Sequence, residues 1–169
     1  MTSIAPPSDI TSRLVLLLFD HWERQRGARL APRWRDIDPG EIRPTLPYLS
    51  TADLLDSPFD LRYRLVGTAV VNAVGYDFTG QNLRSMMVAT GLEVWLTHYR
   101  RTAEERRPKF GIYRAHGGTD LRYKVDNVCL PLSDDGERVN RIMELEDWSM
   151  IRDVSPMRMQ MLAWRFDPL

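Results

Sequence analysis

The sequence predicts an α+β fold, in which a five-stranded antiparallel sheet carries helices over one face and a flanking helix precedes it. Two observations lead to this prediction. Strand-like segments come as a pair near residue 50 and as a group of three after residue 109, with short turns inside each group, as in antiparallel hairpins. Between the two groups the apolar residues take up a helical period, so this middle segment must cross one face of the sheet.

Length and composition place the chain among ordinary globular domains. It has 169 residues, of which 43% are hydrophobic and 27% are charged, enough for about one domain. The 23 basic residues equal the 23 acidic ones, which argues against a nucleic-acid binder or a polybasic membrane protein. The longest apolar run near the N-terminus, Leu14–Phe19, is far shorter than the roughly 20 residues of a membrane span. We therefore expect a cytoplasmic protein without a membrane span.

The first predicted helix runs to about Arg26 and ends at Gly27. Either Ser8 or Thr11 is placed to cap its N-terminus. Its apolar residues, which include the whole run Leu14–Phe19, cover more than one stripe of the helix surface. Such a helix must bury more than one side.

The segment Ala28–Pro47 is rich in proline and contains a helix-start pattern. Asp38 would be the N-cap, Pro39 would take the first helical position, and Glu41 would complete a capping box. Pro44 is expected to end this helix after about one turn.

Two strands are predicted at Leu49–Leu55 and Leu61–Val66. The second alternates Leu61, Tyr63 and Leu65 with arginines, which is typical of a half-buried antiparallel strand.

The helical middle begins with a short helix capped by Thr68 and stopped by Gly75, followed by an irregular segment. A longer helix is predicted over Leu92–Arg107, because its apolar residues share one face: Leu92, Trp95, Leu96, Tyr99 and Ala103.

Three strands close the pattern, at Phe110–Arg114, Leu121–Leu132 and Val139–Trp148, with a turn at residues 116–120. The apolar residues of the long strand change parity along its length. Either a bulge near Asp126 and Asn127 or a change from one buried face to two would explain this change.

These elements divide the chain into three parts. Residues 1–47 hold the N-terminal helix and a proline-rich extension, residues 48–150 hold the sheet domain, and residues 151–169 form a methionine-rich tail. The tail could pack on its own domain or present an adaptable surface to a partner.

The order of elements resembles the PAS fold, and particular segments strengthen the resemblance. Residues 63–69 run into residues 75–83, with residues 36–39 upstream and residues 130–136 downstream, and the first helix carries Trp22-Glu23-Arg24. Together these segments are similar to a bacterial family of stand-alone PAS proteins, over about residues 19–148. The resemblance implies a sensory or regulatory module, since PAS domains bind small molecules or partner proteins.

Known PAS cofactors find no matching motif. PAS photosensors that bind flavin carry a reactive cysteine on a helix between strands two and three, whereas Cys129 is predicted on a late strand. PAS sensors that bind haem use a histidine on the long helix, where His98 lies, but no motif surrounds it. The histidines, His21, His98 and His116, are scattered, and no nucleophile or phosphate-loop motif occurs. We therefore predict neither a cofactor nor a metal, and no enzyme activity.

Two surfaces are assigned from the sequence. A cavity between helix and sheet would be lined by a set of mostly apolar and aromatic residues: Tyr63, Leu65, Val71, Trp95, His98, Tyr99, Ile112, Cys129 and Met143. A symmetric homodimer is predicted through the first helix, with these residues in its interface: Leu14, Val15, Leu16, Leu18, Phe19 and Trp22. The competing interpretation is that the chain's own sheet buries this helix.

The functional hypothesis is a single-domain regulator that acts through contact with an unidentified signalling protein and has no nucleic-acid partner. The alternative is a small-molecule-binding protein or enzyme that uses the same cavity.

Overall fold

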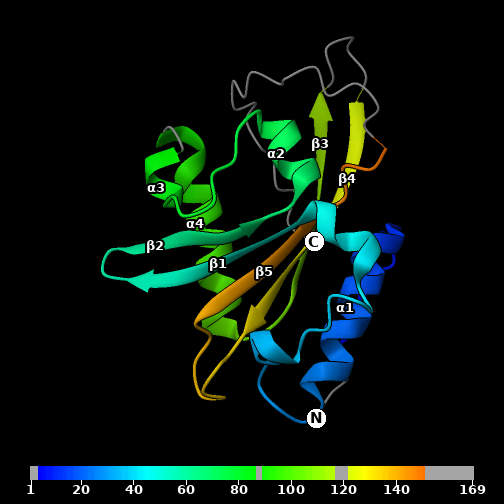
Figure 1. Cartoon of the computed structure of the whole chain (residues 1–169), viewed down its shortest axis with the longest axis vertical. Helices are drawn as coiled ribbons and strands as arrows, with labels where there is room; N and C mark the ends of the chain where they lie inside the picture. The colour runs from blue at the N-terminus through cyan, green and yellow to red at the C-terminus, as the bar shows by residue number, and fades with distance from the viewer. Residues whose placement is uncertain (1–3, 87–88, 117–121, 151–169) are drawn as a thin grey trace.

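The computed structural model describes residues 4–86, 89–116 and 122–150. Five strands form one antiparallel sheet in the order β2-β1-β5-β4-β3, so the predicted fold class is confirmed. The helices and strands in chain order are α1 (Arg13–Arg26), η1 (Trp34–Asp36), η2 (Arg43–Tyr48), β1 (Leu49–Asp56), β2 (Phe59–Val66), α2 (Thr68–Val74), α3 (Leu83–Met86), α4 (Ala89–Glu105), β3 (Lys109–His116), β4 (Arg122–Leu132) and β5 (Arg141–Glu146), where η marks a 3-10 helix. Figure 1 shows α1 beside β4 and β5, while α4 runs behind β1 and β2.

The sheet is covered on both faces. On one face α1 packs on an apolar cluster that includes Val128 and Leu130 of β4 and Met143 of β5. On the other face α2, α3 and α4 pack on a second cluster, to which Cys129 of β4 and Ile142 of β5 belong. The strand β4 pairs with both neighbours without a register shift. The parity change in β4 therefore reflects two buried faces, and the bulge considered near Asp126 is absent from the described pairing.

The N-terminus of α1 is capped by Ser12 rather than by Ser8 or Thr11. The Ser12 hydroxyl accepts a hydrogen bond from the backbone N–H of Val15 at 3.1 Å. The backbone N–H groups of Thr11 and Ser12 donate to Oδ2 of Asp126 on β4, at 2.7 and 2.8 Å. This long-range contact fixes where the helix begins, and sequence-local capping rules do not anticipate it. Gly27 ends the helix as predicted, with φ at 55°.

The helix predicted to start at Asp38 does not form, and this prediction was wrong. The Asp38 carboxylate instead closes a turn by accepting from the backbone N–H of Gly40 at 2.8 Å. Glu41, the expected capping-box partner, reaches α1, where it pairs with Arg24 at 2.7 Å and with buried His21 at 3.1 Å. Contacts with α1 thus replace the local capping pattern.

A bulge in β2 breaks the predicted alternation of that strand. Thr51 of β1 pairs with Leu65 and Ala52 pairs with Tyr63, so Arg64 is the extra residue. Leu61 and Tyr63 point into the core, but Leu65 is 36% exposed because the bulge shifts its side chain to the other face.

Most of the predicted dimer interface lies inside the chain's own core. Val15, Leu18, Phe19 and Trp22 are at most 3% exposed, and the Trp22 indole donates to the carbonyl of Pro131 at 2.8 Å. The prediction that these four residues face a second subunit is therefore corrected, because the second face of the sheet covers them.

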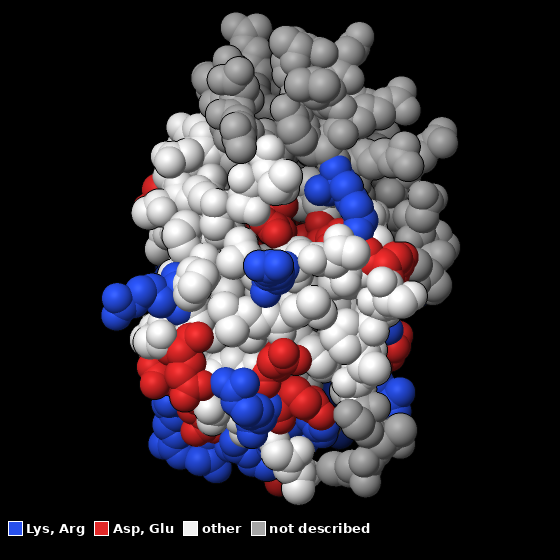
Figure 2. Space-filling model, turned by 90° about the vertical axis from the view of Figure 1, so that its right-hand side faces the viewer, with Lys and Arg blue, Asp and Glu red and all other residues white. Residues whose placement is uncertain are grey.

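The outer side of α1 is mixed in character. Leu14, Leu16 and Leu17 are only partly buried. Figure 2 views this side of the molecule and shows a largely uncharged centre, with acidic and basic side chains intermixed toward its lower end.

Candidate functional site

Four of the predicted cavity residues come together beneath α4. Tyr63 of β2, Trp95 and Tyr99 of α4 and Cys129 of β4 belong to one buried cluster. Trp95 stacks on Tyr99 with ring centroids 5.7 Å apart, and His98 lies edge-on to both rings. The structure therefore brings together the aromatic part of the predicted cavity.

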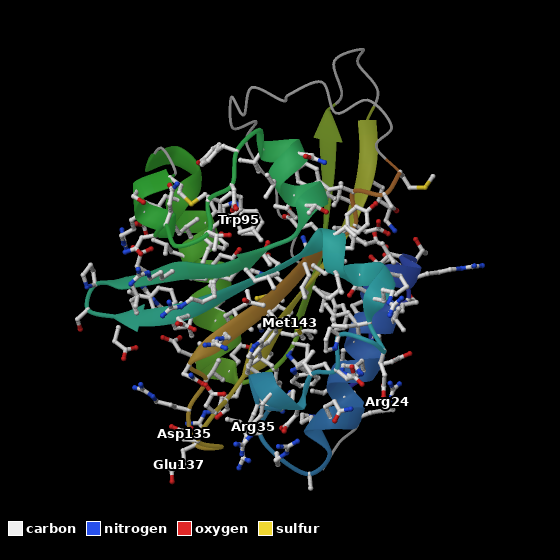
Figure 3. All side chains as sticks on the ribbon, viewed as in Figure 1. Arg24, Arg35, Trp95, Asp135, Glu137 and Met143 are labelled. Carbon is white, nitrogen blue, oxygen red and sulfur yellow. The ribbon has the colours of Figure 1, made fainter. Side chains whose placement is uncertain are left out.

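The other four predicted cavity residues lie elsewhere. Ile112 and Met143 pack on the α1 side of the sheet, because their strand parity is opposite to that of Cys129. Figure 3 labels Met143 on β5 and Trp95 on α4. Leu65 is turned away by the bulge, and Val71 is half-buried on α2, whose buried residues are Val70 and Ala73.

A carboxylate lies at the centre of the aromatic cluster. Glu144 of β5 is 8% exposed and pairs across the sheet with Ser50 of β1 and Cys129 of β4. Its Oε2 accepts a hydrogen bond from the hydroxyl of Tyr99, whereas Oε1 is enclosed without a hydrogen-bond partner among the described residues. Burial raises the pKa of Glu144 to about 8; the charge of Glu146 raises the pKa further, and the bond from Tyr99 lowers it.

Two phenols share this environment. Tyr99 is 2% exposed and Tyr63 is 8% exposed. Burial, and then the charge of Glu144, raise the pKa of both hydroxyls, so both stay protonated. The ring of Tyr63 is held edge-on against Phe78 at 4.7 Å. The phenols are therefore fixed hydrogen-bond groups around the carboxylate.

A buried amide lies one row along the same face of the sheet. Asn127 of β4 is fully buried, and neither its Oδ1 nor its Nδ2 has a hydrogen-bond partner in residues 4–86, 89–116 and 122–150. Its neighbour on β3 is Gly111, where an added Cβ would lie 2.6 Å from Asn127 Oδ1. The absence of a side chain at Gly111 therefore makes the space that the amide occupies.

The thiol and the imidazole of the site are held in their neutral forms. Cys129 is fully buried, and burial and the charge of Glu144 raise the pKa of its thiol well above the usual value. Burial lowers the pKa of His98 to about 4, and the charge of Lys109 lowers it further. Neither group has the properties of an activated nucleophile or a cationic acid at neutral pH.

The site is closed in this conformation. The space that Ser50, Leu61, Tyr63, Tyr99 and Glu144 enclose is too small to admit a water molecule. A ligand can enter only if the side chains between α4 and the sheet move.

A second, open hollow of about 410 Å³ lies on the surface where α1 begins and β5 ends. Its polar groups bind one another: Lys124 pairs with Asp126 at 2.9 Å, and Ser12 donates to Asp147 at 2.5 Å. These pairs join the first helix to the end of the sheet.

Within the described residues, no group of three histidine, cysteine or acidic side chains is placed to hold a metal ion. In the same part of the chain no helix is long and apolar enough to cross a membrane.

The sequence analysis missed Glu144 and Asn127. One signal was present: both are polar residues at alternate positions of strands that are otherwise apolar, with Glu144 two residues after Ile142 and Asn127 two residues after Val125. In a strand that is buried on both faces, such a residue must point into the core.

Comparison with known proteins identifies the family. A model described as the PAS domain matches residues 10–143, and the chain belongs to this family. The match includes α1 and the proline-rich segment, which the sequence analysis set apart from the sheet domain. A search of curated proteins finds no match.

Solved structures similar to the chain include three sensory-type domains. A PAS domain from Colwellia psychrerythraea is 11% identical, covers 63% of this chain and 92% of its own, and has a TM-score of 0.42. A fungal LOV domain photoreceptor is 17% identical, with coverages of 58% and 71% and a TM-score of 0.38. The PAS domain of an HTR-like protein from Haloarcula marismortui is 20% identical, with coverages of 57% and 78% and a TM-score of 0.31.

Proposed function

We propose that this chain is a single-domain sensory or regulatory protein that binds a small polar molecule beneath α4 and signals through contact with a partner protein. One observation carries the proposal: Glu144 Oε1 and both amide atoms of Asn127 are buried without partners in the described part of the chain. Each such atom costs about 1–3 kcal/mol in an unoccupied core. A ligand that satisfies these atoms gives the cost a function, since unpaired buried groups favour binding sites over purely structural cores.

Binding without catalysis is favoured over an enzyme that uses the same site. The Cys129 thiol and the His98 imidazole are neutral at physiological pH. The Glu144 carboxyl is the one group of this set with a pKa near neutrality, at about 8. We therefore propose that the ligand leaves the site chemically unchanged.

Native mass spectrometry tests the binding proposal. Wild-type protein, incubated with a small-molecule extract of its expression host, is expected to carry a mass that Asn127→Leu does not retain. The matched control is Glu137→Gln, an exposed residue in the turn after β4 that Figure 3 places far from Trp95. The proposal is overturned if the wild type gives only the bare protein mass, or if the variant retains the same ligand.

We further propose a symmetric homodimer through the outer side of α1. The corrected surface consists of the partly buried leucines Leu14, Leu16 and Leu17, since the other apolar residues of α1 lie in the core. Light scattering of Leu14→Glu with Leu17→Glu is expected to report a folded monomer, with Asp20→Lys as a control on the same helix. A wild type that is monomeric at high micromolar concentration contradicts this proposal, as does a double variant that remains dimeric.

The proposal keeps a bacterial origin and a cytoplasmic location. The single cysteine, Cys129, is free and buried, which suits a reducing compartment.

A further inference from the structure

The unpartnered atoms beneath α4 are richer in acceptors than in donors. Glu144 Oε1 and Asn127 Oδ1 accept, and only the Asn127 amide nitrogen donates. Glu146, two residues after Glu144, lies on the same face of β5 and raises the negative potential there. A ligand that fits must therefore bring hydrogen-bond donors.

The positive charges of the surrounding elements do not compensate these acids. Lys109 of β3 lies at the rim, where its ammonium group pairs with Glu105 of α4. His98 of α4 is neutral, and the remaining groups that face the site, Tyr63, Tyr99 and Cys129, carry no positive charge. Ionised Glu144 is thus a buried charge without a cation, the arrangement that proteins otherwise avoid.

We propose that the site beneath α4 binds a small primary ammonium compound, whose N–H groups donate to Glu144 and to the Asn127 carbonyl oxygen. An ammonium group offers three donors and one positive charge in a compact volume, which matches two buried acceptor oxygens next to a second carboxylate. This inference rests on the proposed function, because it names the chemical class of the ligand for the same site.

Binding would compete with the contact that holds α4 to the sheet. The Tyr99 hydroxyl occupies Oε2 of Glu144, and the closed space beside it does not admit even a water molecule. An ammonium ligand must therefore displace Tyr99 from the carboxylate. Displacement of Tyr99 loosens α4, which converts ligand binding into a change at the surface of the domain.

The inference also predicts a linkage to protons. The Glu144 carboxyl holds its proton at neutral pH because its pKa is about 8. An ammonium ion favours the carboxylate, so binding releases this proton to solvent. Affinity should therefore rise between pH 6 and pH 9, where a primary amine with a pKa of about 10 is still largely charged.

The experiment is an NMR titration of the ¹⁵N-labelled full chain with ethylammonium chloride and with ethanol as the neutral probe. Ethylammonium is expected to shift the amide signals of β4, β5 and α4 saturably, with an affinity at least tenfold above that of ethanol. Glu144→Gln should weaken ethylammonium binding at least tenfold. Tyr99→Phe should tighten it severalfold, because the competing hydroxyl is gone. Glu137→Gln serves as the surface control.

Three results overturn the inference: no saturable shift with ethylammonium, equal affinity for ethanol, or unchanged binding by Glu144→Gln. A merely structural role of Tyr99 predicts weaker binding by Tyr99→Phe, so a loss of affinity there also contradicts it. If ethylammonium fails while native mass spectrometry finds a neutral ligand, the ammonium inference is wrong and the proposed function stands. If both experiments find no ligand, both are wrong.

Discussion

The two faces of the sheet differ in what they bury. Beneath α1 the core is made of aliphatic and aromatic side chains, such as Leu18, Leu130 and Leu145, none of them more than 1% exposed. Beneath α4 the same strands bury Glu144 and Asn127, with two phenols and a thiol around them. One face therefore has the composition of a stabilising core, and the other tolerates polar groups that cost stability.

The comparison shows how a strand can serve two purposes. Adjacent residues of β4 point to opposite faces, so Val128 and Leu130 stabilise the α1 side while Asn127 and Cys129 shape the α4 side. A change at one position is thus largely separate from its neighbour in its effect. The predictions below exploit this separation.

Exchanging polarity between the faces gives the largest expected effect. Leu130→Asn removes a fully buried leucine and encloses an amide, which should cost roughly 4 kcal/mol or more. Asn127→Leu removes the buried amide from the other face and should change stability by less than about 1.5 kcal/mol in either direction. Urea unfolding of both variants measures the contrast. Equal destabilisation would contradict the distinction between the two faces.

Trp95 tests how firmly α4 is packed. It is 7% exposed and stacks on Tyr99, so Trp95→Ala should lower the free energy of unfolding by about 3–5 kcal/mol. The conservative control is Trp95→Phe, which should recover most of the loss. An unchanged unfolding midpoint for Trp95→Ala would mean that α4 contributes little to the core.

The sequence predicted the elements whose signals are local. The face of α4 is set by residues three and four positions apart, and Leu92, Trp95, Leu96 and Tyr99 are all buried there. The strand pairs followed from short turns between alternating segments. The apolar run in α1 was harder, because burial by a partner and burial by the chain's own sheet demand the same pattern of residues.

The candidate site was only half predictable for related reasons. Periodicity gives the parity of a strand but not which helix covers each parity, so Ile112 and Met143 were assigned to the wrong face. Leu65 was misplaced because its strand contains a bulge at Arg64, which nothing in the local sequence indicates. Glu144 was missed because an alternating strand position does not reveal that a helix closes over it.

The pH dependence of stability should separate the two faces again. The pKa of Glu144 is raised to about 8 by burial in the folded chain, above its ordinary value of 4.5. The folded state therefore retains a proton that the unfolded state loses, and the stability from this group falls as pH rises through 8. Relative to Glu144→Gln, the wild type should lose stability between pH 6.5 and pH 9. Parallel curves for the two proteins in this range would show that Glu144 is not buried as described.

The smallest expected effect concerns Gly111 and Asn127. A Cβ at Gly111 would lie 2.6 Å from Asn127 Oδ1, so Gly111→Ala must push the amide aside. We expect a cost of about 1–2 kcal/mol from this overpacking, measured by chemical denaturation. In an Asn127→Ala background the same change meets no amide, and alanine in a strand is then favoured over glycine by about 0.5–1 kcal/mol. The double-mutant cycle should therefore give a coupling of opposite sign to the single cost. If Gly111→Ala costs the same in both backgrounds, the amide does not occupy the space opposite Gly111, and the polar site beneath α4 would need another support.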